Sequence, residues 1–130
     1  MDRKTIHDML SEAREHLDRL RPREAYRAMR EGAVLIDTRS GDELQRTGDI
    51  PGALHIPMSV LEWRVDPASE THDPAVADQQ IILLCAHGYS SSLAARRLQE
   101  LGYGEATDVI GGFEAWAAEG LPIRPVEPPG

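Results

Sequence analysis

The apolar positions of this chain follow two spacings that alternate along its length. Between residues 6 and 20, apolar side chains recur every three or four positions, which predicts an amphipathic helix. Further on, the unbroken apolar run 33–36, which ends at Asp37, predicts a strand that is buried on both faces, as in a parallel sheet. Residues 53–56, 80–84 and 107–110 are also expected to form short strands. Helices or helical turns are expected between them, at residues 22–30, 40–48, 60–64, 75–78, 93–101 and 112–119. Strands that alternate with helices predict an α/β fold with helices on both faces of the sheet.

Composition and charge narrow the range of functions. A chain of 130 residues is expected to form one domain, and no apolar run approaches the ~20 residues of a membrane-spanning helix. The net charge of −8 argues against nucleic acid or an anionic membrane as a partner. Residues 1–5 lead into a charged helix rather than the apolar core of a signal peptide, so a cytoplasmic location is expected.

The only cysteine, Cys85, follows directly after the apolar run 80–84. A polar loop containing Gly88 comes next, and Ser91 or Ser92 is expected to cap the following helix. Backbone N–H groups of such a loop, together with the positive end of the helix dipole, form a site for an anion and favour the thiolate, which is the nucleophile. The alternative is a small core cysteine without chemistry.

No metal or other cofactor is expected. Cys85 and His87 lie close together in the sequence, but a structural zinc site needs four ligands and no second pair completes the set. A lone cysteine also cannot form an internal disulfide, and a reducing compartment would keep it free.

Four ordered motifs make the chain resemble the rhodanese family of sulfurtransferases. The spacing Cys-x-x-Gly-x-x-Ser at residues 85–91 resembles the family's active-site loop. Leu-Ile-Asp-Thr-Arg at 35–39 looks like the first core strand. The segment 48–57 is similar to Gly-His-Ile-Pro-Gly-Ala, with Asp49 in the place of the His. The segments 109–116 and 120–122 look like the C-terminal signature.

This resemblance implies a fold, a domain division and a reaction. The fold would be an open, mostly parallel five-stranded sheet over residues 21–123, preceded by a helical extension (1–20) and followed by a flexible proline-rich tail (124–130). Cys85 would take sulfur from thiosulfate or a persulfide, carry it as its own persulfide, and pass it to a thiol, cyanide or an acceptor protein. The expected cradle is the loop amides of Ala86, His87, Gly88, Tyr89, Ser90 and Ser91.

One position departs from the family pattern, because many active rhodaneses carry Arg where this chain has Ser90. Residues 61–67 resemble a segment of some single-domain bacterial rhodaneses, which makes Arg64 one candidate for the missing cation, with Trp63 as a pocket wall. The alternative is a core Trp beside an exposed Arg. Arg39 belongs to the site region by resemblance, but we expect it to pair structurally with Asp42 or Glu43.

The sequence also allows expectations about where three further side chains lie. His87 either adds positive charge near a leaving anion or faces solvent. Tyr89 is expected at the mouth of the pocket, and Trp116 in the core beside Phe113.

Two other functions remain as alternatives. A cysteine phosphatase or arsenate reductase of related fold needs Cys-x5-Arg, yet the sixth residue after Cys85 is Ser91. A non-catalytic or partner-specific sulfur carrier or sensor remains compatible with Ser90.

Overall fold

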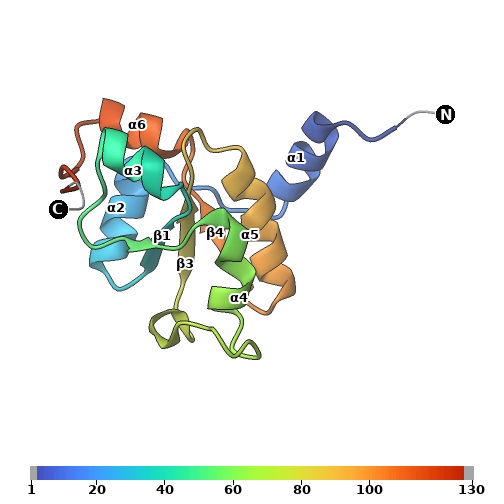
Figure 1. The fold of residues 1–130 in the computed structure, drawn as a ribbon. Helices are drawn as coiled ribbons and strands as arrows, with labels where there is room; N and C mark the ends of the chain where they lie inside the picture. The colour runs from blue at the N-terminus through green and yellow to red at the C-terminus, as the bar shows by residue number, and fades with distance from the viewer. Residues whose placement is uncertain (1–2, 128–130) are drawn as a thin grey trace.

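A four-stranded parallel sheet forms the centre of the protein, whose computed structural model describes residues 3–127 (Figure 1). The strand order is β2 (Leu54–His55), β1 (Val34–Asp37), β3 (Ile81–Leu84) and β4 (Thr107–Asp108). Every neighbouring pair runs parallel, with Ile36 of β1 opposite Leu83 of β3. The predicted α/β class is confirmed, whereas the expected fifth strand is not among the strands of residues 3–127.

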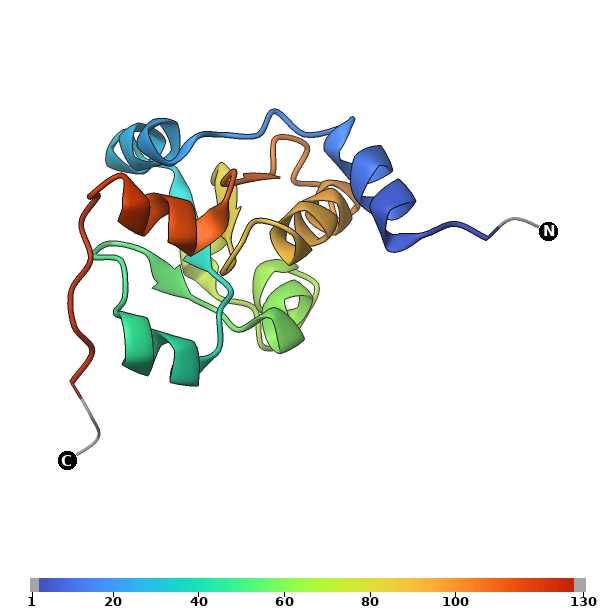
Figure 2. The same ribbon diagram turned by 90° about the horizontal axis from the view of Figure 1, so that it is seen from above.

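Helices cover both faces of this sheet, as Figures 1 and 2 show. One face carries α2 (Pro22–Arg30) and α6 (Gly112–Ala118), and the other carries α4 (Leu61–Val65) and α5 (Ser90–Glu100). The remaining helices are α1 (Ile6–Arg14), α3 (Gly41–Thr47), η1 (Met58–Val60) and η2 (Pro74–Val76). Among residues 3–127, no helix combines the length and apolar character needed to cross a bilayer.

The alternation of side chains along each strand divides the core in two. Ile81 and Leu83 of β3 face the helices α4 and α5, whereas Ile82 and Leu84 face α2 and α6. Trp116 is fully buried in the part of the core between the sheet and the helices α2 and α6, so its predicted core position is confirmed. Its ring N–H donates to the carbonyl of Pro122 at 3.0 Å.

The N-terminal helix is shorter than predicted, because α1 ends at Arg14. The following residues leave the helix so that Leu17 enters the core and Leu20 forms a parallel bridge with Val109. The Leu20 N–H donates to Asp108 O at 3.0 Å, and the Ile110 N–H donates to Leu20 O at 2.8 Å. Hydrogen bonds to the edge beside β4 thus replace the last predicted helical turns.

The segment after α6 is also more ordered than the proline content predicted. Arg124 pairs with Asp49 through two backbone hydrogen bonds of 2.9 Å and through an ion pair of 2.8 Å. The start of the proline-rich tail is therefore fixed against the turn that follows α3; residues 128–130 lie outside the described part.

Candidate functional site

Cys85 lies at the carboxyl end of β3, where the backbone turns into a tight loop before α5. The residue is 6% exposed, so the surrounding loop covers most of it. Gly88 adopts a left-handed conformation (φ 84°), and its N–H donates to Cys85 Sγ at 3.2 Å. The predicted arrangement of strand, glycine loop and helix is present.

The start of α5 differs from the prediction. The helix begins at Ser90 rather than at residue 93, and neither Ser91 nor Ser92 caps it. Both hydroxyls instead donate to the carboxylate of Asp108 at 2.7 Å. Because this buried acceptor binds them, the serines lie inside the first turn, and the helix N-terminus moves closer to Cys85.

Opposing effects set the pKa of the Cys85 thiol. Burial raises it, whereas hydrogen bonds from the Ser91 and Ser90 hydroxyls and from the Ser91 and Gly88 amides lower it, and the net result is a pKa below the ordinary value. The Ser91 hydroxyl has a single proton, which Asp108 accepts in this arrangement. The backbone amides are therefore the dependable donors to the sulfur, and they favour the thiolate.

Glycines allow the first turn of α6 to pack directly on the cysteine loop. A Cβ at Gly112, whose φ is 60°, would overlap the Cys85 carbonyl oxygen, and one at Gly88 would lie 2.7 Å from Gly111 N. The close approach lets the Phe113 N–H donate to Cys85 O at 2.8 Å and the Glu114 N–H donate to Ala86 O at 3.1 Å. These bonds engage the loop carbonyls on the α6 side and restrict the loop to one shape.

Two arginines from the N-terminal segment also reach the loop, and sequence reasoning missed both. Arg14 donates to Gly88 O at 2.8 Å and to Ser92 Oγ at 3.1 Å, and Arg19 donates to Gly88 O at 3.0 Å. Arg19 forms a further ion pair of 2.8 Å with the buried carboxylate of Asp108. An acidic residue inside the short strand expected at 107–110 was a signal for Asp108, but no local pattern pointed to either arginine.

Two loop side chains face outward. His87 is exposed, and its Nδ1 lies 2.8 Å from Glu114 Oε2, so it faces the surface rather than the sulfur. Tyr89 is exposed at the rim of the loop, and its ring centroid is 5.9 Å from Arg14 Cζ.

Arg39 is buried and has a structural role, as expected, but the prediction of its ion-pair partner is wrong. Its guanidinium binds both carboxylate oxygens of Asp37, at distances down to 2.7 Å, instead of Asp42 or Glu43. It also donates to Thr47 Oγ1 and Gly48 O, and its Cζ lies 3.7 Å from the ring centroid of Phe113. With its N–H groups engaged in this way, Arg39 stabilises the end of β1.

The structure separates Trp63 and Arg64 from Cys85. Trp63 is 60% exposed and borders a hollow with Leu101, which follows the far end of α5. Arg64 lies 3.9 Å from Asp73, a residue that precedes β3. Both lie toward the amino end of β3, whereas Cys85 lies at its carboxyl end. Trp63 is therefore not the core residue of the alternative expectation, while the exposed position expected for Arg64 in that alternative is present.

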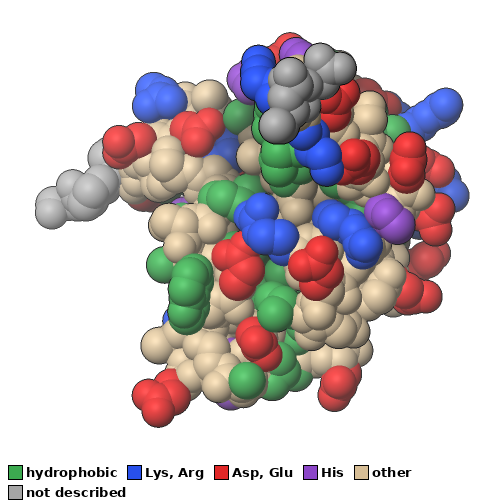
Figure 3. Space-filling view, turned by 90° about the vertical axis from the view of Figure 1, so that its right-hand side faces the viewer, with side chains coloured by type: hydrophobic (Ala, Val, Ile, Leu, Met, Phe, Trp, Pro, Cys, Tyr) green, Lys and Arg blue, Asp and Glu red, His purple; other side chains and the backbone are tan. Residues whose placement is uncertain are grey.

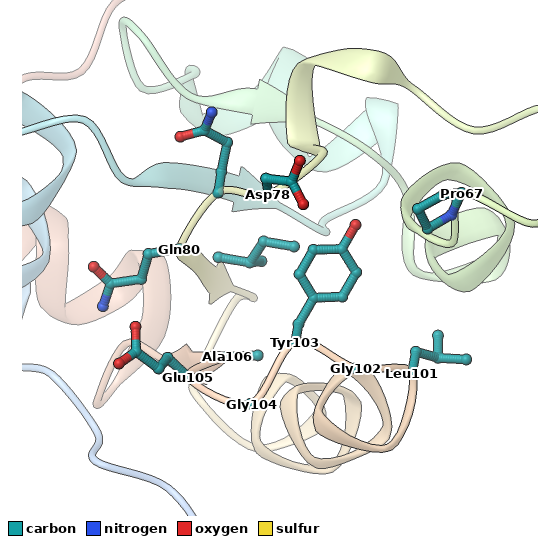
Figure 4. A pocket seen from close by; sticks show the side chains of 11 residues that line it. Pro67, Asp78, Gln80, Leu101, Gly102, Tyr103, Gly104, Glu105 and Ala106 are labelled. Carbon is teal, nitrogen blue, oxygen red and sulfur yellow. The ribbon is translucent and has the colours of Figure 1, made fainter.

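A surface hollow of 380 Å³ also lies at that far end (Figure 4). Its walls include Gln80 at the start of β3 and Tyr103 after α5, whose hydroxyl donates to Val65 O at 2.9 Å. Burial, followed by the negative charges of Asp78 and Asp66, raises the pKa of Tyr103. The hollow contains no cysteine or histidine, and it is distinct from the thiol site.

Comparisons with known proteins agree with this geometry. Residues 21–119 match the rhodanese-like domain family. The chain is 36% identical over 104 residues to a thiosulfate sulfurtransferase of Haemophilus influenzae, covering 78% of this chain and 90% of the relative. It is 34% identical over 93 residues to a sulfurtransferase of Allochromatium vinosum, covering 72% and 79%.

Two solved structures share the fold over most of this chain. A Rhodopseudomonas palustris protein of unknown function, described as a possible tyrosine phosphatase, has a TM-score of 0.86 at 32% identity and covers 95% of this chain and 97% of its own. The polysulfide-sulfur transferase homodimer of Wolinella succinogenes has a TM-score of 0.71 at 27% identity, covering 91% and 85%.

Proposed function

Since the chain belongs to the rhodanese-like family, we propose that it is a sulfurtransferase and that Cys85 carries the sulfur. The observation that supports this most directly is the thiol at the end of β3, which accepts the Gly88 N–H and has a lowered pKa. A thiolate held at the start of a helix is a nucleophile that backbone dipoles stabilise. Cys85 is a free thiol, as such a nucleophile requires.

The proposed reaction has two steps. The Cys85 thiolate attacks the outer sulfur of thiosulfate or of a persulfide, the sulfur–sulfur bond of the donor breaks, and sulfite or a thiolate leaves with the electron pair. Cys85 is now a persulfide, whose outer sulfur is surrounded by the loop amides. A thiol or cyanide then attacks that outer sulfur and restores the Cys85 thiolate.

Intact-protein mass spectrometry tests the first step. We expect the protein to gain one sulfur atom after incubation with thiosulfate or a persulfide donor, and to lose it when cyanide is added. Cys85→Ser, whose oxygen cannot form a persulfide, should not change in mass. A wild-type mass that stays constant with every donor would overturn the proposal.

A non-catalytic carrier or sensor would also form the persulfide, so turnover must be measured separately. Continuous thiocyanate production from thiosulfate and cyanide indicates an enzyme, whereas a single loading without turnover indicates a carrier. Replacing Ser90 by Arg restores the charge typical of the family, and we expect it to raise thiosulfate turnover if charge limits the rate.

The similarity to a Rhodopseudomonas protein described as a possible tyrosine phosphatase makes phosphatase activity worth a direct assay. The chain has Ser91 at the position where a cysteine phosphatase needs its arginine, and Arg96 and Arg97 lie further along α5. We therefore expect no appreciable hydrolysis of an aryl phosphate.

A further inference from the structure

Trp63 is an exposed aromatic residue that the proposed reaction does not use. It is 60% exposed, whereas Trp116, the other tryptophan of the chain, is fully buried. Leu61 and Val65 of α4 are also fully buried, and Trp63 lies two positions from each, which is about 200° around the helix axis. The packing of these two residues therefore directs the indole to the surface, where exposed apolar groups that gather together mark interaction sites.

The indole borders a surface hollow of 320 Å³. Leu101, which follows the end of α5 and is also exposed, supplies a second apolar side chain. The other walls come from α4 and the loop after it, through Glu62, Asp66, Ala68 and Ser69. A hollow with an aromatic group, an aliphatic group and two carboxylates can bind both the charged end and the apolar stem of a long basic side chain.

Hydrogen bonds fold the loop that forms one side of the hollow. The Asp66 N–H donates to Glu62 O at 2.9 Å, and the Ala68 N–H donates to Asp66 Oδ1 at 3.0 Å. At the end of the loop, the Asp73 N–H donates to Arg64 O at 2.7 Å and ties the chain back to α4. The walls are thus in place before a ligand arrives, which lowers the cost of ordering them on binding.

The charged wall residues are both acidic. Glu62 forms an ion pair of 2.8 Å with Arg97, but Asp66 forms no ion pair with any residue between 3 and 127. An uncompensated carboxylate therefore lies beside an indole, the aromatic ring that attracts cations best. A guanidinium group suits this place better than an ammonium, because it is planar, stacks on aromatic rings and is more weakly hydrated.

The charge of the whole molecule favours a basic partner over a second copy of this chain. On the face formed by α1, α4 and α5, hydrophobic side chains lie exposed among acidic and basic ones (Figure 3). A second copy would carry the same net charge of −8 and, in a symmetric pair, would place an identical acidic wall against this one. A basic segment would instead be attracted both at long range and at the hollow.

We propose that the hollow beside Trp63 is a docking site for an arginine on an apolar segment of a partner protein. The guanidinium stacks on the indole and faces Asp66, and the apolar neighbours of the arginine contact Leu101. The eleven residues of α5, about 16 Å of helix, separate Leu101 from the cysteine loop. A partner docked here leaves Cys85 accessible, and the site does not depend on the proposed sulfur transfer.

Acrylamide quenching of tryptophan fluorescence tests the site in the unmodified protein, because the quencher reaches the exposed Trp63 and not the buried Trp116. The probe is a five-residue peptide in which leucine and arginine alternate. Its control has citrulline in place of arginine, which keeps the size and removes the charge. We expect the arginine peptide to protect Trp63 from quenching at least twofold at saturation, and the citrulline peptide to bind about three- to tenfold more weakly, the range for one charge several ångströms away at intermediate dielectric.

Isothermal titration calorimetry with the arginine peptide then compares variants. Asp66→Asn keeps the acceptor for the Ala68 N–H and removes the charge, and it should weaken binding about three- to tenfold. Asp49→Asn makes the same change at the pair with Arg124 and should leave the affinity unchanged. Trp63→Leu keeps an apolar side chain without a ring, and it should weaken the arginine peptide more than the citrulline peptide.

Three results would overturn the proposal. The first is equal binding of the two peptides to wild type, a comparison that needs no variant to fold. The second is an affinity for the arginine peptide that is the same in Asp66→Asn, Trp63→Leu and wild type, with circular dichroism showing all three folded. The third is a dimer of wild type in analytical ultracentrifugation that Trp63→Leu abolishes, which would assign the hollow to a second copy of the chain.

Discussion

Asp108 and Asp49 form arginine pairs of matching geometry at very different depths. In each pair the arginine Nε lies 2.8 Å from one carboxylate oxygen and Nη2 lies 3.2 Å from the other. The side chains of Arg19 and Asp108 are 15% and 0% exposed, against 63% and 26% for Arg124 and Asp49. Asp108→Asn and Asp49→Asn make the same change of charge, so their comparison isolates what burial and extra partners contribute.

The expected losses of stability differ several-fold. Breaking a buried ion pair by removing one partner costs about 3–5 kcal/mol, because the other charge remains without compensation. At position 108 the two hydroxyls of Ser91 and Ser92 also lose a charged acceptor. An exposed pair contributes only about 0.2–1 kcal/mol. Since a domain of this size is stabilised by about 5–15 kcal/mol in total, Asp108→Asn should remove a large fraction.

Urea unfolding followed by tryptophan fluorescence measures both losses, because the fully buried Trp116 reports on the core. With an unfolding entropy near 2.1 cal/mol/K per residue, 1 kcal/mol corresponds to about 4 °C in Tm for this chain. We therefore expect Asp108→Asn to lower Tm by about 11–18 °C, and Asp49→Asn by less than about 4 °C.

The reasoning would be refuted by equal losses in the two variants, provided that the slope of the unfolding curve is the same for both. It would also fail if Asp49→Asn were the more damaging change. Either result would mean that Asp108 acts as a replaceable hydrogen-bond acceptor rather than as the charge under the cysteine loop.

Two further predictions concern the loop. Gly112→Ala should lower the free energy of unfolding by more than about 2 kcal/mol, because the φ of Gly112 is positive and a Cβ there would overlap Cys85 O. The control is Gly104→Ala, which has open space around it and should change that free energy by no more than about 1 kcal/mol. Urea unfolding of both variants measures the difference. The pH midpoint of Cys85 alkylation should lie below 9.0 in the folded protein and return to about that value in urea. Because the folded protein has the lower pKa, the stability that the thiolate contributes is present above the ordinary pKa and is lost as the pH falls through the folded-state pKa. Equal midpoints in the folded and unfolded protein would contradict this prediction.

The sequence predicted the parts of the structure that depend on local signals. A buried apolar run, a glycine and a helix start were enough to place Cys85 at the end of β3. The same signals placed α2, α6 and the core position of Trp116. Each of these features depends on residues a few positions apart, which is the range that spacing describes.

The parts that could not be predicted depend on contacts between distant segments. Arg14 and Arg19 reach Gly88 across 74 and 69 positions, and hydrophobic periodicity contains no information on such a meeting. The serines of α5 were expected to act as a cap, but a buried carboxylate is the stronger acceptor and changed where the helix begins. Arg64 was placed near the thiol by resemblance alone, and the packing of α4 puts it at the other end of the sheet.

The Leu20 bridge also covers one edge of the sheet. Beside β4, the Asp108 carbonyl and the Ile110 amide are occupied only because Leu20 reaches them. A fragment that begins where the family match begins would lack Leu20. These two backbone groups would then be unpaired at an exposed sheet edge, through which chains can pair and aggregate. The residues before position 21 thus cover this edge of the sheet and oppose its pairing with another chain.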